Sequence, residues 1–591
     1  MTRKTAKSRV WFFPTSPRSP YKLKGELALL KSVSGVPWSR QQGQAQFVEL
    51  LKQDPGYEGA AQASDTTFPA RDRTRGPKML GLIEVKGRGV TSRLSITEAG
   101  EKLLSLTDEF DDILFLNQVA KVQFPSAQHN SADFLEMNCR PLTITLKFMI
   151  EIGPITKEEF GLFVLPTVKP ELLGKHIQAL SEFRMKISSA HPGLPRKTLR
   201  SQLVDERVAE IYAPDIEAGN TLLREGGDDF IKTKRQTLTG DYADSSFRYL
   251  LATGLFRIDQ HGKTFSIVPS RMAEASGLVS ELGLASTFSN YLQDGYVTQY
   301  LGSLNEPGMS STSKEAMSQL LNDLLDAGNF FASDKAQIIS GFEDLSNGVD
   351  RAVLCRSIES EQRSINVRER AASLVRNREE VSDQVNAVFA EIVDRSAEII
   401  DRPLMLEWNT WRALTVLNDA VAVTGNFRTD VEGNPLGHAA GNQADIVVEY
   451  EDFWLAVEVT LQSGARQHET ESESITRHVG LLQAKRKQEG DSRPVFGLFI
   501  APKVNETVVN YILVTSKMNS RVYEGPVRIV PIELNSFQAF ISKNKTLTST
   551  SSKPLNTFLS SQFLSPSALS GDERNWLQSV GESISELTLT D

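Results

Sequence analysis

The chain has 591 residues, 40% hydrophobic and 24% charged, which predicts a soluble protein of three or four domains because domains usually run to about 100–200 residues. Its apolar runs fall short of the roughly 18–20 residues that cross a membrane, and two cysteines, Cys139 and Cys355, exclude a disulfide framework and a structural zinc site. The net charge of −9 is unevenly distributed, since the first 100 residues contain 17 Lys and Arg against 8 Asp and Glu and carry +9, which leaves −18 for the remainder.

The first hundred residues therefore form a basic segment on an acidic chain. Lysine and arginine neutralise DNA phosphates and release counterions, so this composition is typical of a DNA-binding arm; a solvated basic surface is the alternative. The N-terminus has only VWFF as an apolar run and lacks the features of a signal peptide. We expect a protein of the reducing cytoplasm with no membrane partner.

Helices followed by short hairpins dominate residues 1–280, the predicted DNA-recognition region. Apolar side chains have helical spacing over 24–33 and 44–53; a strand over 78–85, a turn, a strand over 93–96 and a helix from 97 follow. The pattern recurs as a helix over 245–254 and a hairpin over 255–270. Two such units predict winged-helix-like subdomains, although a helix with a hairpin is common elsewhere.

Residues 281–385 are polar and amphipathic, which predicts a helical linker, and residues 386–591 alternate helices and strands. The elements expected there are helix 403–418, strands 444–450 and 454–460, helix 469–488, strand 494–502, helix 506–517 and strand 527–533. A Ser/Thr-rich loop over 543–562 and a last helix over 572–587 complete the chain. The predicted fold class is multidomain α/β (α+β).

Two acids, Asp445 and Glu458, lie within the apolar strands of the hairpin at 444–460. With residues 451–452 as the turn, Asp445 lies opposite Glu458, and opposed side chains share a face with Cβ atoms about 4.5–5.5 Å apart. The opposite face is then wholly apolar. A turn shifted by one residue would place the acids on different faces.

Opposed carboxylates repel each other, so one must be protonated or a cation must lie between them. A hard divalent cation with oxygen ligands fits, and Mg²⁺ is usual where phosphate is also bound. Two solvated acids on a half-exposed strand are the alternative.

Three further residues are expected beside these acids. Glu407 lies on the preceding helix, whereas Glu471 and His478 are seven residues apart on one face of the following helix. Such a convergence is a known way to build a metal-dependent phosphodiesterase, in which the metal binds the scissile phosphate and lowers the pKa of a water. His478 is a candidate proton shuttle or phosphate contact, with a surface histidine as the alternative.

Several segments of the chain resemble one known family. The run HAAGNQADIVVEYEDFWLAVEVT (438–460), followed by GARQHETESESITRH (464–478), resembles the cleavage core of the AlwI-type restriction endonucleases, type IIS enzymes that include site-specific nicking endonucleases. The segments SPRSP, FPARDRTRGPKMLGLIEV, RLSITEAGEKLL, VQFPSAQH, FRYLLATGLF and LEWNTW resemble the same family in the same order. The resemblance covers about residues 10–535.

The resemblance implies winged-helix-like recognition subdomains, a helical linker and a C-terminal nuclease domain of the PD-(D/E)xK class. It implies Mg²⁺-dependent cleavage, with Mn²⁺ able to substitute, a short fixed distance outside a short asymmetric site of the GAGTC or GGATC kind in double-stranded DNA. The catalytic residues carried over are Glu407, Asp445, Glu458, Glu471 and His478, and the metal ligands among them are Asp445, Glu458 and Glu471.

The resemblance also implies partners. One metal site cuts one strand, so double-strand cleavage needs a second nuclease domain from another copy or a partner subunit. A restriction enzyme further implies a cognate DNA methyltransferase that protects the host, and a bacterial cytoplasm.

One position departs from the general nuclease motif, which has a lysine two residues after the second acid. Thr460 stands there, and the family resemblance includes this EVT sequence. The lysine would orient water or stabilise the phosphate. Glu471, His478, Arg477 and Gln462 are the candidates for that role; Arg477 could equally be an ordinary ion-pair residue.

Two motifs of the recognition region, SPRSP and PARDRTRGPK, are expected to contact DNA. Arginine reads guanine in the major groove and also binds phosphate, whereas an aspartate accepts from cytosine or holds the arginines in place. The expected contacts are Ser16, Arg18, Ser19, Arg71, Asp72, Arg73, Arg75 and Lys78. Contact with phosphate or solvent is the alternative for each.

The sequence thus predicts a type IIS site-specific DNA endonuclease, with a strand-specific nicking endonuclease of the same family as one alternative. A DNA-binding subunit with an inactive nuclease fold is the other, supported by Thr460. A structural or transport protein has no support beyond the long linker helices.

Overall fold

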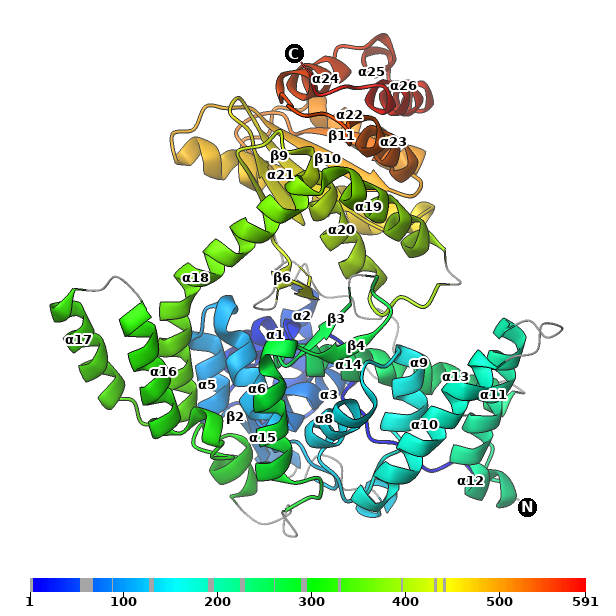
Figure 1. Cartoon of the computed structure of the whole chain (residues 1–591), viewed down its shortest axis with the longest axis vertical. Helices are drawn as coiled ribbons and strands as arrows, with labels where there is room; N and C mark the ends of the chain where they lie inside the picture. The colour runs from blue at the N-terminus through cyan, green and yellow to red at the C-terminus, as the bar shows by residue number, and fades with distance from the viewer. Residues whose placement is uncertain are drawn as a thin grey trace. The chain divides into compact units, whose positions relative to one another are not determined.

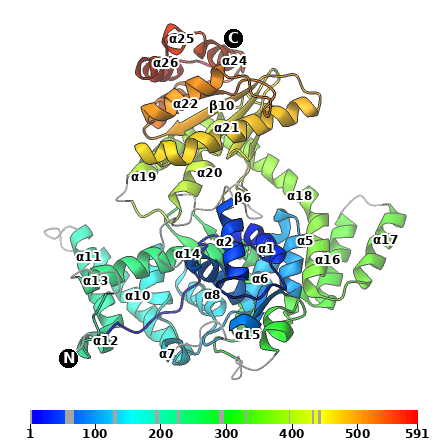
Figure 2. The same cartoon turned by 180° about the vertical axis from the view of Figure 1, so that it is seen from behind.

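The computed structural model describes residues 4–590 except for 54–66, 88, 127–131, 190–195, 224–228, 260, 288–294, 328–330, 395–396, 430–432 and 439–442. The chain folds as two compact units, Met1–Asp259 with Lys263–Glu361 and Gln260–Gly262 with Gln362–Asp591 (Figures 1 and 2). It passes from the first unit to the second within α18 (Gly348–Arg376). The three predicted domains, 1–280, 281–385 and 386–591, stay a prediction.

The first unit is mainly helical and carries two short antiparallel hairpins. β1 (Ile83–Lys86) pairs with β2 (Arg93–Ile96), and β3 (Phe256–Ile258) pairs with β4 (Phe265–Ile267). The helices that precede α18 are α1 (Lys22–Ser32), α2 (Gly43–Gln53), α3 (Phe68–Arg73), α4 (Arg75–Met79), α5 (Glu98–Ser105), α6 (Asp111–Lys121), α7 (Ala132–Leu135), α8 (Pro141–Ile152), α9 (Lys157–Glu159), α10 (Leu173–Ser188), α11 (Arg196–Ile211), α12 (Ala213–Glu217), α13 (Phe230–Gln236), α14 (Ala243–Leu251), α15 (Met272–Leu282), α16 (Lys314–Ala327) and α17 (Ala332–Glu343). Short 3₁₀ or π-helical turns lie at Gly89–Thr91, Asp108–Phe110, Phe160–Val164, Pro170–Leu172, Thr237–Tyr242, Pro269–Arg271, Tyr296–Leu301 and Ser310–Thr312.

The predicted alternation of helix and hairpin is present at both places in the first unit. Thr97 begins α5 after the first hairpin, because its hydroxyl accepts a hydrogen bond from the Gly100 amide at 3.1 Å. The first strand starts later than expected, since Lys78 and Met79 complete α4. The assembly of these pieces into winged-helix subdomains stays a prediction.

A five-stranded mixed sheet forms the centre of the second unit. Its order is β11 (Arg528–Glu533), β10 (Val495–Ala501), β9 (Trp454–Val459), β8 (Ile446–Glu449) and β5 (Ala422–Gly425). The strands β9, β10 and β11 are parallel, whereas β8 and β5 are antiparallel to their neighbours. A separate small pair is formed by β6 (Arg428–Thr429) and β7 (Pro435–Gly437).

Helices cover both faces of this sheet. They are α19 (Arg378–Val393), α20 (Arg402–Leu417), α21 (Ala465–Gln488), α22 (Glu506–Lys517), α23 (Leu534–Asn544), α24 (Lys553–Gln562), α25 (Pro566–Ser570) and α26 (Glu573–Ser585). α20 contacts β5, β9, α19 and α23, whereas α21 contacts β9, β10 and α22. α19 and α20 lie in front in Figure 1, and α21 and α22 lie in front in Figure 2. Every residue of β10 is buried, as expected for a strand covered on both sides.

The predicted helices and strands of the second unit are present in the predicted order. The structure adds β5, β6, β7, α23 and α25, which were not predicted, and two further features differ. The long helical run of the linker region breaks at Asn377, between α18 and α19. The expected Ser/Thr-rich loop over 543–562 ends in the helix α24, because Leu555, Phe558 and Leu559 have helical spacing and are buried. The chain has the mixed helix and sheet content predicted. Within the described residues, no helix is both long and apolar enough to span a bilayer.

Candidate active site

Glu407 is presented by α20, a helix with well-defined ends. Asp401 caps its N-terminus by accepting from the Leu404 amide at 3.3 Å, and Asn418 ends it in a left-handed conformation with φ of 53°. Glu407 is 6% exposed. Its Oε2 atom is shielded from solvent and has no hydrogen-bond partner among the residues that the structure describes. A buried carboxylate oxygen without a partner destabilises the folded state, and a bound cation would remove this cost.

The hairpin of β8 and β9 has the register predicted from the sequence. Ile446 pairs with Val457, and Glu449 pairs with Trp454. Asp445 precedes β8, and its Oδ2 atom accepts a hydrogen bond from the Val459 amide at 2.9 Å, which ties it to the end of β9. Asp445 and Glu458 therefore lie at the same end of the hairpin.

The face of β9 that carries Glu458 is covered by α21. Arg486 of α21 lies 3.9 Å from the Trp454 ring, and Nδ1 of His478 lies 2.7 Å from Oε1 of Glu458. Glu458 is 7% exposed. This corrects the alternative of two solvated acids on a half-exposed strand, since a helix excludes water from Glu458.

Thr460 connects the end of β9 to α21 at the position where the motif lysine was expected. Its hydroxyl donates to Oε1 of Glu471 at 3.0 Å and accepts from the Gln462 amide at 3.1 Å. Arg477 donates to Glu473 at 3.0 Å, as an ordinary helical ion pair does. The structure therefore brings Glu471, Thr460 and Glu458 together.

The electrostatics of the cluster reflect several acids removed from water. Burial raises the pKa of Asp445 well above that of an ordinary aspartate, and the Glu458 and Glu407 carboxylates raise it further. Burial likewise raises the pKa of Glu458, helped by Glu471 and Glu407. The pKa of His478 falls to about 4 because of burial and nearby Arg477, so its imidazole is neutral at pH 7.

The donor set fits a hard divalent cation. Carboxylate oxygens are the ligands that Mg²⁺ prefers, and Oε2 of Glu407 is a buried oxygen that no described residue contacts by a hydrogen bond. The side chains are not gathered into a finished coordination sphere, since no three His, Cys, Asp or Glu side chains of the described residues stand ready to hold an ion. Oε1 of Glu458 and Oδ2 of Asp445 are engaged by His478 and Val459, respectively.

His438 also belongs to the cluster, although the sequence did not single it out. Its Nδ1 lies 2.5 Å from Oε1 of Glu407, and its Nε2 lies 3.3 Å from Oδ2 of Asp401. Burial would lower the pKa of His438, but Glu407 and Asp401 together raise it well above the ordinary value. His438 follows β7, a strand that the sequence pattern did not indicate. No spacing connects it to α20, so only the fold reveals this contact.

The predicted DNA contacts in PARDRTRGPK have different surroundings. Arg73 forms a largely buried ion pair with Glu26 at 2.7 Å, their side chains being 13% and 6% exposed. Arg75 is 62% exposed and lies 3.2 Å from Asp72. Burial lowers the pKa of Lys78, and Arg75 adds to this. Arg73 is therefore used in an ion pair inside the protein, whereas the side chain of Arg75 is exposed to solvent.

The remaining predicted contacts lie near the N-terminus and on α3. Arg18 is 51% exposed and pairs with Asp241 at 2.6 Å. Ser16, Ser19 and Arg71 are half-buried. A DNA role for all eight predicted residues stays a prediction.

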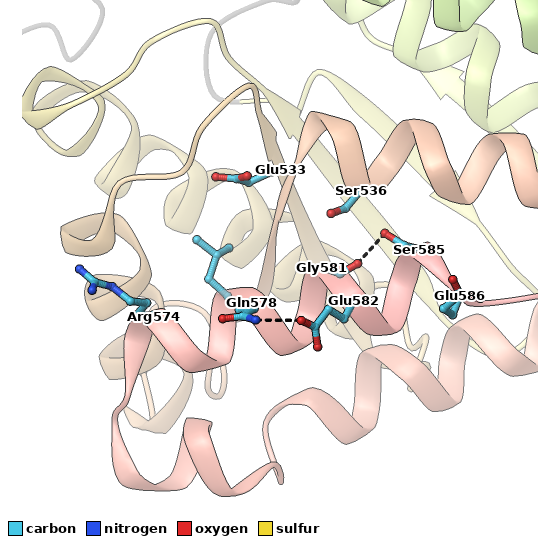
Figure 3. Close-up of a pocket in the computed structure, with 9 residues that line it drawn as sticks. Glu533, Ser536, Arg574, Gln578, Gly581, Glu582, Ser585 and Glu586 are labelled. Carbon is cyan, nitrogen blue, oxygen red and sulfur yellow. Dashed lines mark hydrogen bonds between the residues drawn. The ribbon is translucent and has the colours of Figure 1, made fainter.

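A separate hollow of about 510 Å³ lies between the end of β11, α23 and α26 (Figure 3). It is acidic, with Glu533, Glu582 and Glu586 on its wall. Lys503 pairs with Glu533 at 2.8 Å, and Lys543 pairs with Glu586. These surface ion pairs distinguish the hollow from the buried acids around Asp445.

Comparison with known proteins identifies the family. The model of the AlwI restriction endonuclease family matches residues 78–540. The chain belongs to the AlwI restriction endonuclease family. This confirms the predicted family and the predicted enzyme, a restriction endonuclease that acts on DNA. Restriction endonucleases normally use divalent metal ions, in agreement with the oxygen-rich cluster.

Two solved structures are among those similar to this family member. The small subunit of the heterodimeric restriction endonuclease R.BspD6I is 23% identical, covers 34% of this chain and 98% of its own, and has a TM-score of 0.28. Restriction endonuclease FokI is 11% identical, covers 83% of both chains and has a TM-score of 0.19. A search of curated protein sequences gives no match.

Proposed function

We propose that this AlwI-family protein is a type IIS endonuclease that hydrolyses DNA with Mg²⁺ a short fixed distance outside a short asymmetric site of the GAGTC or GGATC kind. The observation that carries the proposal is the convergence of half-buried Asp445 with buried Glu458 and Glu407, where Oε2 of Glu407 has no hydrogen-bond partner among the described residues. Such a cluster has no structural benefit without a cation, because each carboxylate destabilises the others.

Asp445, Glu458 and Glu471 would hold the metal ion, with Glu407 beside them. When bound, the ion polarises the scissile phosphate and lowers the pKa of a water. His478 keeps Glu458 in place through their 2.7 Å hydrogen bond. We also assign His478 as the proton shuttle or phosphate contact.

Thr460 does part of what the motif lysine does elsewhere. It cannot supply a charge, but it holds Glu471 at the end of β9 through a 3.0 Å hydrogen bond. This contact supports an active site with a PD-(D/E)xK-type arrangement over the alternative of an inactive DNA-binding subunit. Glu471 and His478 are the groups that we assign to orienting the water.

Recognition is assigned to residues 1–280, which carry both hairpins and the basic segment, with winged-helix-like subdomains contacting the DNA. Residues 281–385 form the linker, and residues 386–591 form the nuclease domain. We expect a cognate DNA methyltransferase to protect the host site, a cytoplasmic setting, and Mn²⁺ to substitute for Mg²⁺.

One acid cluster cuts one strand at a time. A strand-specific nicking endonuclease is therefore the second candidate, since a single chain acting alone would leave the other strand intact. Double-strand cleavage requires a second nuclease domain, from another copy or from a partner subunit.

The deciding experiment compares Asp445→Asn with Asp452→Asn, an isosteric change in the exposed turn of the same hairpin. With Mg²⁺ and plasmid DNA, Asp445→Asn should lower cleavage at least about 10³-fold while DNA affinity stays within a few-fold, and Asp452→Asn should cleave like the wild type. Native and denaturing gels distinguish nicked from linear product, and sequencing of the ends gives the site and offset. Wild-type cleavage by Asp445→Asn would refute the site; no product from the wild type at high enzyme would favour the inactive DNA-binding subunit.

A further inference from the structure

His438 bridges two carboxylates of one helix. Asp401 and Glu407 both lie at the beginning of α20, and the imidazole contacts Oδ2 of Asp401 at 3.3 Å and Oε1 of Glu407 at 2.5 Å. Each ring nitrogen therefore faces one carboxylate oxygen. Two contacts at fixed positions determine the orientation of the ring and of both acids.

The Asp401 end of this bridge is anchored to the backbone. Oδ1 of Asp401 accepts from the Leu404 amide at 3.3 Å and caps α20, while Oδ2 faces His438. Asp401 is 5% exposed. The ring is thereby held by the residue that caps the first turn of the helix.

The Glu407 end leaves one oxygen unused. Oε1 is occupied by Nδ1 of His438, whereas Oε2 is buried and, within the described part of the chain, has no hydrogen-bond partner. A glutamate side chain loses rotamer entropy when it is fixed, and the hydrogen bond to His438 offsets this cost before any metal arrives.

We propose that His438 is a positioning residue that fixes Glu407, so that Oε2 of Glu407 faces the divalent cation of the acid cluster. This inference rests on the proposed function. The contacts from Asp401 through His438 to Glu407 fix the Glu407 side of the metal site. Asp445 and Glu458 supply the other side.

Two amide substitutions separate the two contacts of the ring. The asparagine nitrogen of His438→Asn replaces Nδ1 and keeps the donor to Glu407, whereas the glutamine nitrogen of His438→Gln replaces Nε2 and keeps the donor to Asp401. Asp401→Asn retains the helix cap but turns an amide toward Nε2. His468→Ala is the matched control, because His468 of α21 bonds Ser472 at 2.8 Å.

The test measures Mn²⁺ binding to the full-length, DNA-free protein by calorimetry, together with the Mg²⁺ concentration for half-maximal cleavage. His438→Ala and His438→Gln should weaken Mn²⁺ binding about 10–100-fold and raise the Mg²⁺ requirement by a similar factor. His438→Asn should stay within about 5-fold of the wild type, Asp401→Asn should fall between, and His468→Ala should be unchanged. The melting temperature without metal, measured alongside, shows whether each variant is folded.

Wild-type Mn²⁺ affinity in folded His438→Gln, or equal losses in His438→Asn and His438→Gln, would overturn the positioning role. If His438→Ala fails to fold, the two amide variants and Asp401→Asn decide the question. A wild-type protein that cleaves DNA while all His438 variants bind Mn²⁺ normally would leave the proposed function intact and remove this inference alone. A wild-type protein that neither binds Mn²⁺ nor cleaves DNA would refute both.

Discussion

Thr460 stands where nuclease motifs of this kind carry a lysine, and its contacts explain why a short hydroxyl suffices there. The hydroxyl donates to Glu471 and accepts from the Gln462 amide, so it joins the end of β9 to α21. A hydrogen bond to a charged group is worth about 1.5–3 kcal/mol, which corresponds to roughly 10–100-fold in rate where it positions a catalytic group.

Thr460→Val removes this hydrogen bond with little change in volume. We expect cleavage at saturating Mg²⁺ to fall about 10-fold or more, with DNA binding retained, in a plasmid-cleavage time course. Thr476→Val is the control, since the Thr476 hydroxyl only bonds the Ser472 carbonyl within α21. Equal rates for wild type and Thr460→Val would show that Glu471 does not depend on Thr460.

Asp419 predicts a pH-dependent stability unrelated to catalysis. Both of its carboxylate oxygens are shielded from solvent, and burial raises its pKa from 3.8 to about 7 despite its own backbone N–H and nearby Arg378. A raised pKa means that the folded protein holds the proton more tightly than the unfolded chain. The contribution of Asp419 is therefore most favourable below about pH 4 and is lost progressively as the pH rises to about 7.

The shift corresponds to about 4 kcal/mol at full ionisation. Asp419→Asn should accordingly raise the unfolding free energy of the second unit at pH 8 and leave it nearly unchanged at pH 4. Urea unfolding at both pH values measures this, with Asp452→Asn in the exposed turn as the control. The same pH dependence in wild type and Asp419→Asn would contradict the assignment.

At the scale of elements, the hairpin of β8 and β9 was predictable and its surroundings were not. Alternation of side chains fixes which residues share a face, so Asp445 and Glu458 could be placed together once a turn was assumed. The helix α24 was missed because its serines and threonines outweigh the buried spacing of Leu555, Phe558 and Leu559.

Contacts between segments far apart in the chain could not be predicted from the sequence. His438 meets Glu407 across 31 residues, and β7, which delivers it, is three residues long. Periodicity describes neighbours along an element, and it carries no information about which loop reaches which helix. The ion pair of Arg73 with Glu26 could not be predicted either, because the two residues lie on different elements.

α21 carries Glu471 and His478, so the packing position of α21 should determine where these two side chains lie in the site. A Cβ added at Gly480 would come 2.4 Å from the Tyr523 ring, which is far closer than packed atoms allow. Gly480→Ala should therefore destabilise the second unit by about 1–3 kcal/mol and reduce cleavage through displacement of α21. Gly174→Ala, a change on α10 with open space around it, is the control. Thermal unfolding and cleavage at 25 °C measure the two effects, and an unaltered melting temperature for Gly480→Ala would show that Tyr523 moves aside without cost.

At the scale of the whole molecule, the charge distribution is typical of a protein that binds DNA with one segment and cleaves it with another. The first 100 residues carry +9 on a chain of net charge −9, and the acid cluster lies in the second unit. Binding through phosphates depends steeply on salt, whereas the chemistry of a buried cluster does not. DNA affinity and cleavage rate on bound DNA should therefore respond differently to salt.

The order in which products appear tests how many nuclease domains act on one site. A single cluster cleaves one strand, so excess protein on a one-site plasmid should give nicked circles first, at a rate that no longer rises with protein concentration once the site is saturated. If a second copy supplies the other cut, the linear product should appear later and its rate should keep rising with protein concentration, because a second chain must arrive. Addition of Asp445→Asn protein to the wild type should then slow linearisation more than nicking, since each mixed pair contains one active domain. Linear DNA formed without a nicked intermediate, at a rate independent of concentration, would instead mean that the functional enzyme is already an assembled pair.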